Sequence, residues 1–361
     1  MRGSRTVTAA VTLVVAFGVG VGTSLGATSL ARPDAQASWH IIEQVHSGSD
    51  GQFTAVTAVG SDGGWAFNGI GGPTAFERSG PAWSQVPFPK VSGQVIAAGA
   101  TSPDNVWAFT DDLAGSSALR WNGSTWTVMR TFSRQIGGAA VVAADDVWVF
   151  GMPYIPGAYL GAWNYNGHAW TPVSGGSDLE GGSGLSPSDI WAFDGADVAH
   201  WNGSAWTRTS VASLLPARNP LNGPAVTGVY AQSADSVYAV GNGNEQDEGG
   251  PIVLLHYNGR TWSKVAEGDF GLGTQPLQQI APDGHGGLWI PMPGVDGQNS
   301  YLLHYSGGML TPVTLPVPSS KISIDSVARI PGTTNVLAGG FTHAAGNDGG
   351  NVVSVLLEYG S

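Results

Sequence analysis

The sequence predicts an all-β protein, a seven-bladed β-propeller whose blades are four-stranded sheets. An apolar strand with a central aromatic residue recurs every 41 to 51 residues, and Asn-Gly turns recur between shorter strands. A period of about 40 to 50 residues built of short strands is typical of a propeller. The recurring position is occupied by Trp65, Trp107, Trp148, Trp191, Tyr238, Trp289 and, in the last repeat, Leu337.

The composition supports a folded, turn-rich chain. Only 11% of the 361 residues are charged, against about 25% in a typical globular protein. Hydrophobic residues make up 42%, with 14 tryptophans and 55 glycines. A disordered chain would need low hydrophobicity and high charge, so this balance favours a packed β-protein.

The charge and the absence of cysteine exclude several classes of function. A net charge of −12, with only 14 Lys and Arg residues, argues against a nucleic-acid partner, which requires clustered cations. The acidity suits a soluble protein that binds neutral ligands or cations. Because there is no cysteine, disulfides, thiolate metal sites and cysteine nucleophiles are excluded.

Residues 1–37 are expected to be a signal peptide. Arg2 and Arg5 precede a largely apolar stretch from Val7 to Ala27, and Ala35-Gln36-Ala37 has the small-residue pattern of a cleavage site. An uncleaved membrane anchor is the alternative, because the apolar stretch approaches the roughly 20 residues that span a bilayer. We therefore expect a secreted protein, extracellular or associated with the cell wall, monomeric and without a membrane span after cleavage. Residues 38–361 are expected to form one propeller domain.

Each repeat is interpreted as four strands, A to D, in the order of the chain. In the second repeat, strand A (VIAAGAT) is small and apolar, so it is expected nearest the axis, where seven strands converge. The turn SPDN leads to strand B (VWAF), and a variable loop leads to strand C (ALRW). An Asn-Gly turn then leads to strand D, which begins with Trp126. The predicted units are 53–90, 95–132, 136–174, 179–211, 226–266, 277–316 and 322–360.

Asn-Gly pairs at 122–123, 166–167, 202–203 and 258–259 are expected to close the hairpins between strands C and D. Asn and Gly adopt positive φ at low cost, which such tight turns require. Asn122 and Asn202 also begin glycosylation sequons, but the equivalent turns lack the serine, so we interpret them as turn residues.

The last repeat ends after its third strand, at LLEYGS, and the missing strand is expected at the other end of the chain. The segment that begins at Ser38-Trp39 is similar to the D strands STWTVMRT and RTWSKVAE. We therefore expect the N-terminal strand to complete the seventh blade. This arrangement closes the ring and protects the edges that an open array would expose.

At VWAF and ALRWNGSTW the chain resembles the kelch-like propeller repeats of secreted actinobacterial proteins. The resemblance covers residues 39 to 360 and implies a seven-bladed propeller without implying an activity. Gly339-Gly340 is the only pair in the double-glycine position of kelch repeats, and the WD-repeat signature is absent. The copper chemistry of kelch propellers of the galactose-oxidase type requires a cysteine, so the sequence excludes it.

Candidate ligand-binding residues lie in the loops between strands B and C and between strand D and the next strand A. These loops share one face of a propeller and surround the mouth of its central channel, where function varies over a rigid frame. The candidates are Asp111, Asp112, Tyr154, Tyr159, Asp194, Asp197, Arg218, Asp296, His343 and Asp348. Blade 5 adds a further acidic loop with Glu245, Asp247 and Glu248.

Three interpretations of this acidic ring remain open. The first is that these residues only form turns and maintain solubility. The second is a binding site for carbohydrate or cell-envelope ligands, since aromatic faces stack on sugars and carboxylates bind hydroxyl groups. Asp-Gly loops also suit Ca²⁺, the one cofactor considered, although no EF-hand spacing is present and no metal residues are assigned. The third is a glycan-active hydrolase or lyase that uses a carboxylate pair. A scaffold for protein partners, without a small-molecule site, is also compatible with the fold.

Three histidines, His200, His256 and His304, occupy the same position in strand C of their repeats. Arg120, Glu77 and Glu358 fill that position elsewhere, so we expect exposed structural residues rather than metal ligands. His343 alone is expected in a loop between strands B and C. No G-x-S-x-G, H-E-x-x-H, P-loop or dinucleotide motif occurs.

Overall fold

The computed structural model describes most of the chain from Ala37 onwards, and Ala37–Ser361 forms one compact unit. The described residues are 37–46, 51–69, 72–152, 160–216, 224–242, 251–270, 279–292, 300–318, 322–343 and 352–360. The expected signal peptide, up to Gln36, lies outside them. Among the described residues, no helix combines the length and the apolar character needed to cross a membrane.

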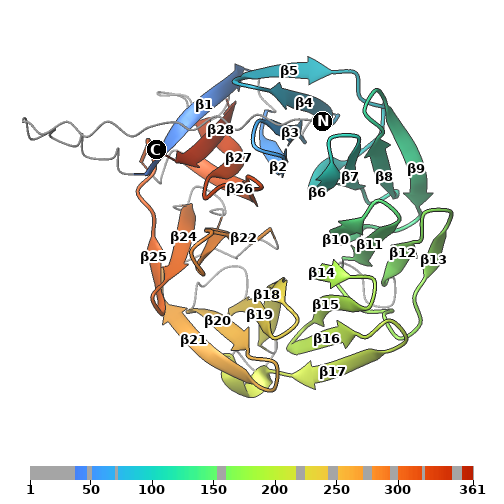
Figure 1. Ribbon diagram of the computed structural model, residues 1–361, viewed down its shortest axis with the longest axis vertical. Coiled ribbons are helices and arrows are strands. Elements are labelled where there is room, and N and C mark those ends of the chain that lie inside the picture. The colour runs from blue at the N-terminus through green and yellow to red at the C-terminus, as the bar shows by residue number, and fades with distance from the viewer. Residues whose placement is uncertain are drawn as a thin grey trace, which may run out of the picture. The chain divides into compact units, whose positions relative to one another are not determined.

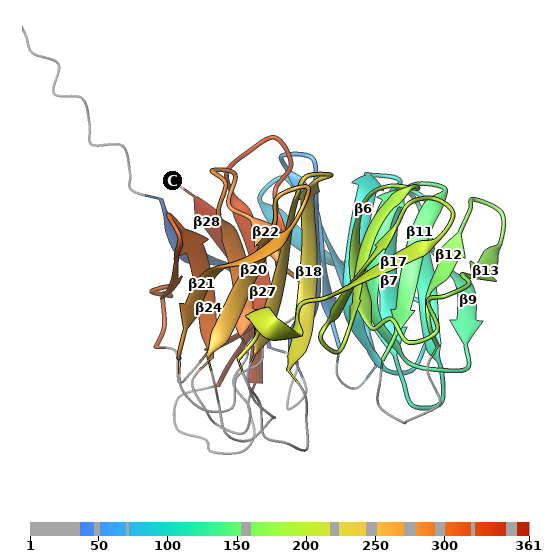
Figure 2. The same ribbon diagram turned by 90° about the horizontal axis from the view of Figure 1, so that it is seen from below.

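The described residues form seven antiparallel sheets of four strands, which confirms the predicted fold class. Figure 1 shows the sheets arranged as blades around a common axis, and Figure 2 shows the same ring edge-on. Blades 1 to 3 consist of β2 (Phe53–Val59), β3 (Gly63–Asn68), β4 (Thr74–Ser79) and β5 (Ala82–Val86); β6 (Gln94–Ser102), β7 (Asn105–Asp111), β8 (Ser116–Trp121) and β9 (Trp126–Phe132); and β10 (Ile136–Ala143), β11 (Asp146–Gly151), β12 (Trp163–Tyr165) and β13 (Trp170–Pro172). Blades 4 to 6 consist of β14 (Gly181–Ser186), β15 (Asp189–Asp194), β16 (Asp197–Trp201) and β17 (Trp206–Ser210); β18 (Ala225–Ser233), β19 (Ser236–Asn242), β20 (Ile252–Tyr257) and β21 (Trp262–Gly268); and β22 (Ala281–Pro282), β23 (Leu288–Met292), β24 (Tyr301–Ser306) and β25 (Met309–Pro312). Blade 7 consists of β26 (Ile322–Arg329), β27 (Val336–His343), β28 (Val352–Gly360) and β1 (Ser38–His46), and a short 3₁₀ helix, η2 (Ala212–Leu214), follows β17.

The first strand of each blade lies nearest the axis, as its small residues predict (Figure 1). Gly99 and Gly182 show why small residues are needed there. A Cβ added at Gly99 would lie 2.7 Å from a methyl group of Val141 in the next blade, and one at Gly182 would lie 2.5 Å from the Phe150 ring. At these positions an inner strand therefore packs against the neighbouring blade more closely than a larger side chain would allow.

The recurring aromatic residues join each blade to the next. Trp65 and Trp107 are at most 2% exposed. Trp126, at the start of the outer strand of blade 2, meets Trp65 of blade 1 edge-on, with ring centroids 5.0 Å apart and planes at 87°. Trp170 meets Trp107 in the same way, at 5.9 Å and 81°. Edge-to-face pairs of this kind add about 0.5–1.5 kcal/mol beyond burial, so the repeated tryptophans stabilise the blade interfaces.

The Asn-Gly turns close the hairpins between the third and fourth strands, and the two residues have different roles. Gly123 has a φ of +90°. The Asn122 side-chain oxygen accepts hydrogen bonds from the backbone N–H groups of Ser124, at 3.1 Å, and Thr125, at 2.9 Å. Glycine therefore supplies the left-handed backbone, and asparagine satisfies the amides of the turn.

The N-terminal strand completes the seventh blade, as predicted. The sheet order is β1-β28-β27-β26, and Trp39 pairs with Tyr359. Trp39 is 6% exposed and packs edge-on against Trp289 of blade 6, 5.2 Å between centroids. A salt bridge of 2.9 Å between Arg78 and Glu358 joins blade 1 to blade 7. The pairing of β1 with β28 therefore places both ends of the described chain in blade 7, where they contact blades 6 and 1.

Candidate functional site

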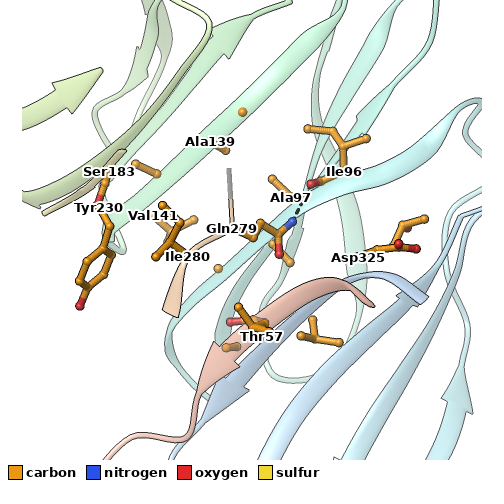
Figure 3. Close-up of a pocket in the computed structure, with 18 of the residues that line it drawn as sticks. Thr57, Ile96, Ala97, Ala139, Val141, Ser183, Tyr230, Gln279, Ile280 and Asp325 are labelled. Atoms are coloured by element: carbon orange, nitrogen blue, oxygen red, sulfur yellow. Dashed lines mark hydrogen bonds between the residues drawn. The ribbon is translucent and has the colours of Figure 1, made fainter. Parts of the chain in front are cut away.

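A cavity of about 840 Å³ runs along the axis of the ring. Its walls are the inner strands β2, β6, β10, β14, β18 and β26, with Gln279 and Ile280 before β22 (Figure 3). Each inner strand runs from one face of the ring to the other. The cavity therefore has an end beside the loops that join strand B to strand C, here called the B–C end. The opposite end, beside the turns that join strand A to strand B, is called the A–B end.

The B–C end is polar. Among the described residues, Gln52, Gln94, Asp111, Ser323 and Asp325 line the cavity there, together with Met152 and Phe341. Amide and carboxylate groups of several blades thus converge on one space. A concave site with a few converging polar groups is the usual form of a small-ligand site.

Asp325 reaches the channel because β26 carries a β-bulge. Ile324 pairs with Gly340 and Ser326 pairs with Gly339, so Asp325 has no partner in the ladder. A Cβ on Gly340 would lie 1.9 Å from the Ser323 carbonyl oxygen, so this close approach of β26 and β27 requires glycine. The Ser323 hydroxyl donates to Asp325 at 3.0 Å. Burial raises the pKa of Asp325 to about 7, and the bond from Ser323 only partly opposes this.

Asp111 is the second channel carboxylate. It ends β7 and pairs with Gln94, the first residue of β6. Gly93, just before that strand, has a φ of +81°, and an added Cβ would lie 1.6 Å from the Asp111 carbonyl oxygen. Burial raises the pKa of Asp111 despite hydrogen bonds from Gln94. Two carboxyl groups that resist ionisation therefore line one cavity.

Gln279 crosses the channel. Its Nε2 donates to the carbonyl oxygen of Ile96 in β6 at 2.7 Å, and its Oε1 accepts from the hydroxyl of Ser326 in β26. Figure 1 places β22 and β6 on opposite sides of the ring, and Figure 3 shows the bond to Ile96 as a dashed line. The Ser326 hydroxyl in turn accepts from the Val56 amide at 2.9 Å. One amide group thus connects blades 6, 7 and 2 through the centre of the protein.

The A–B end has a different character. Tyr230 and Arg329 line it, and the neighbouring wall is built of small apolar residues. Ala58, Ala100, Val141, Gly184 and Pro331 are those at the rim. Arg329 is the only cationic residue among the described lining residues. Among its described lining residues, the channel therefore has one acidic, amide-rich end and one apolar end that carries the positive charge of Arg329.

The site residues predicted from the sequence lie at different positions relative to the cavity. Asp111 lines the cavity. Asp112 lies in the loop after β7, where its carboxylate accepts from the Ala114 amide at 2.7 Å. Asp194 and Asp197 pair across the β15–β16 hairpin and are not among the lining residues. The structure therefore brings only Asp111 of these four to the channel wall.

His343 was expected in a loop, but its backbone forms the last residue of β27. The β-ladder continues to that point because His343 pairs with Val352. Its side chain lies outside what the structure describes. The other candidates, Tyr154, Tyr159, Arg218, Asp296 and Asp348, and the acidic loop of blade 5, also lie outside the described residues.

Asp194 instead belongs to a cluster of charges at the edge of blade 4. Arg208 donates to Asp194 at 3.1 Å and also to Asp178. Burial, together with the charges of Asp194 and Asp178, raises the pKa of the nearby Glu180 to about 7. Burial, followed by Asp178, also raises the pKa of Asp194, and Arg208 opposes that shift. This cluster joins the segment before β14 to strands β15 and β17.

Sequence reasoning missed Asp325, Gln279 and Glu180. Asp325 had a usable signal, because an acid in the inner strand ISIDSVA interrupts the small apolar pattern of the other inner strands. Gln279 precedes a strand of only two residues, and its partner lies 183 residues away in the sequence. No local pattern predicts such a contact.

The three strand histidines are structural, as expected, but they are half-buried rather than exposed. His200 and His304 stack on Trp191 and Trp289, with centroids 4.2 and 4.1 Å apart. His304 also bonds Asp283 at 2.9 Å. Burial opposes ionisation of Asp283, but bonds from His304 and from the His285 and Gly287 amides outweigh it and lower the pKa of Asp283.

Within the described ranges, no three His, Asp or Glu side chains are grouped so as to hold a metal ion. A calcium ion therefore remains an expectation from the loop sequences.

No protein-family model matches the chain, and no curated protein matches it. Solved structures do match. One is a catalytically inactive virginiamycin B lyase from Staphylococcus aureus with quinupristin, at 10% identity and a TM-score of 0.59, covering 88% of this chain and 99% of that one. The WD40 β-propeller domain of Doa1 matches at 13% identity and a TM-score of 0.58, covering 88% and 96%. YCF48 from Cyanidioschyzon merolae matches at 13% identity and 0.55, covering 90% and 99%. At these identities the likeness concerns the fold alone: the chain is a seven-bladed β-propeller with WD40 and other propeller proteins among its structural neighbours.

Proposed function

We propose that the protein is an extracellular binding module whose channel accepts a neutral, hydroxyl-rich ligand, a carbohydrate or a cell-envelope glycan, at the B–C end. The observation that carries the proposal is the convergence of Gln52, Gln94, Asp111, Ser323 and Asp325 on one cavity of about 840 Å³. The extracellular location rests on the export signal expected from the sequence.

The chemistry of these groups favours hydroxyl partners. A carboxylate accepts hydrogen bonds from hydroxyl groups, and a glutamine side chain both donates and accepts. The cavity's only described cation, Arg329, lies at the other end. Phe341 adds an aromatic ring beside these polar groups, and a sugar combines hydroxyl edges with apolar C–H faces. Neutral sugars therefore fit this end better than anions do.

Binding to a glycan array, followed by calorimetry on the best ligand, tests the proposal. Asp111→Asn and Gln94→Ala are expected to weaken binding at least tenfold, about 1.4 kcal/mol. The first replaces one acceptor oxygen by an NH₂ donor, and the second removes the side-chain amide from the cavity wall. Asp112→Asn is the matched control, since the Asp112 carboxylate accepts a hydrogen bond within its own loop. If no glycan binds, or if the control weakens binding as much as Asp111→Asn, the proposal is wrong. A protein partner bound instead, with all three variants unchanged, would favour a scaffold.

A second candidate is a glycan-active hydrolase or lyase. It is favoured by one observation: Asp111 and Asp325 line the same cavity and both have raised pKa values, that of Asp325 at about 7. A carboxyl group that stays protonated near neutral pH can act as a general acid. The similarity to a lyase shows that this fold can carry an enzyme, and nothing more specific.

Product analysis distinguishes the two functions. If the protein is an enzyme, a bound glycan is shortened on incubation, and Asp325→Asn abolishes the cleavage while binding is retained. If the protein is a binding module, the glycan is recovered intact with the parent protein.

A further inference from the structure

The A–B end of the channel presents a fixed arginine at an apolar rim. Arg329 ends β26 and pairs with Val336. Its Nε donates to the Thr333 carbonyl oxygen at 2.9 Å, which holds one edge of the guanidinium. Gly284, in the neighbouring turn, packs against it: an added Cβ would lie 3.2 Å from the Arg329 Nη2. The guanidinium is thus positioned from two sides before any ligand arrives.

Within the described ranges, no carboxylate lies at ion-pair distance from Arg329. The carboxylate of the adjacent turn, Asp283, is occupied by other donors. It accepts from His304 at 2.9 Å and from the amides of His285 and Gly287 at 2.7 and 2.8 Å. Because a guanidinium remains charged at all relevant pH values, Arg329 brings to the cavity wall a positive charge that no described carboxylate pairs with.

Tyr230 lies at the same end, on β18 of blade 5. Burial raises the pKa of its hydroxyl, and the charge of Arg329 opposes the shift. The hydroxyl therefore remains protonated at neutral pH and can donate a hydrogen bond. Figure 3 shows Tyr230 and Asp325 on opposite sides of Gln279. The tyrosine and the channel acid thus lie on different sides of the crossing amide.

The wall between these groups and the centre is apolar. Ala98, Ala139, Val141, Val229 and Ile280 line it. The Ser183 hydroxyl, which also lies on the wall, accepts from the Ala231 amide at 3.1 Å, so it is engaged within the blades. A ligand that fills this space has an apolar body and needs one anionic group for Arg329.

We propose that the A–B end is a second binding site, which takes a small amphiphilic carboxylate. Its carboxylate is held by Arg329 and the Tyr230 hydroxyl, and its apolar body lies against the alanine, glycine and valine wall. A planar guanidinium matches a carboxylate through two parallel hydrogen bonds, and one positive charge matches a single anionic group. The site shares no residue with the proposed glycan site and can be tested without it.

Benzoate and benzamide, which have nearly the same shape and differ in charge, test the proposal. Titration of the purified ¹⁵N-labelled protein, followed by NMR, measures both affinities and reports directly on the Arg329 Nε–H signal. We expect benzoate to bind at least tenfold more tightly than benzamide and to shift that signal. Arg329→Gln is expected to bring the ratio close to one by weakening benzoate alone, and Tyr230→Phe to reduce the ratio severalfold. Asp325→Asn, at the other end, is the control and is expected to preserve the preference.

Equal binding of the two probes by the parent protein would overturn the proposal. So would a preference that survives in Arg329→Gln, or benzoate binding that leaves the Arg329 signal unmoved. Should Arg329→Gln fail to fold, the Arg329 signal of the parent protein and the ratio in Tyr230→Phe decide the question. If the protein binds no glycan but prefers benzoate to benzamide, only the function proposed above fails. If it binds a glycan but shows no preference for benzoate, only the present proposal fails.

Discussion

Gln279 donates a hydrogen bond to the carbonyl oxygen of Ile96 at 2.7 Å, across the channel from blade 6 to blade 2. Blades of a propeller normally contact only their neighbours, as in other repeat proteins. Here one side chain connects non-adjacent blades, and through Ser326 it also reaches blade 7. Gln279 therefore lines the cavity and also connects the inner strands of non-adjacent blades by hydrogen bonds.

Gln279→Met is expected to lower the free energy of unfolding by about 1–2 kcal/mol. The substitution keeps the volume but removes both hydrogen bonds, each worth about 0.5–1.5 kcal/mol. Urea denaturation followed by tryptophan fluorescence measures the change. Gln52→Met, also in the channel wall, is the control, with an expected change within about 0.5 kcal/mol. Equal losses in the two variants would contradict a role for the crossing amide.

Asp325→Asn is expected to stabilise the protein in a pH-dependent manner. Burial raises the pKa of Asp325 to about 7 in the folded protein, from its ordinary value of 3.8. Between about pH 4 and pH 7 the unfolded chain has lost this proton while the folded protein retains it, so the free energy of unfolding falls as pH rises. Asparagine has no proton to lose. The stability difference between variant and parent should therefore be small at pH 4, grow towards pH 7 and stay constant above it.

Urea denaturation at several pH values measures that difference. Glu180, whose pKa is also raised to about 7, contributes equally to both proteins and cancels. A difference that does not vary with pH would mean that Asp325 is ionised normally in the channel.

Arg208→Gln is expected to destabilise the protein by about 1 kcal/mol at pH 8, since the pairs are partly exposed and screened by solvent. Arg208 is the described cation that bonds Asp178 and Asp194, and without it the negative charges near Glu180 are no longer balanced. Acid protonates the carboxyl groups, so the loss should shrink towards pH 4. Thermal unfolding at the two pH values is the measurement. Lys264→Gln is the matched control, since Lys264 makes an exposed pair within its own strand.

Trp39→Ala is expected to cost about 3–5 kcal/mol, the usual effect of removing a buried aromatic side chain. Trp39 is 6% exposed and contacts both Trp289 and Tyr359. Trp39→Phe should cost markedly less, because the ring contact survives. Chemical denaturation measures both. A loss of under 1 kcal/mol for the alanine variant would mean that β1 contributes little to the closure of the ring.

The fold could be predicted from the sequence because its signals are local and repeated. The spacing of Trp65, Trp107 and Trp148 indicates a structural repeat, and each of these blades is formed by the residues of its own repeat. The strand at Trp39 was predictable for the same reason, since it has the pattern of a missing D strand. Asp325 and Gln279 were missed because their positions depend on a bulge and on a contact through the centre of the ring. Asp111 was predicted at the mouth of the channel, but only the fold places it on the same cavity as Asp325.

The pairing of β1 with β28 makes the first strand of the ring depend on the last one synthesised. Until Val352–Gly360 has been made, β1 has no partner, and Trp39 has only part of its pocket. Contacts between residues so distant in sequence form late and slow folding. A truncated chain would therefore keep an unpaired edge and an exposed tryptophan, which are marks that proteases and chaperones recognise. The pairing of β1 with β28 therefore also distinguishes a chain with a complete seventh blade from one that lacks it.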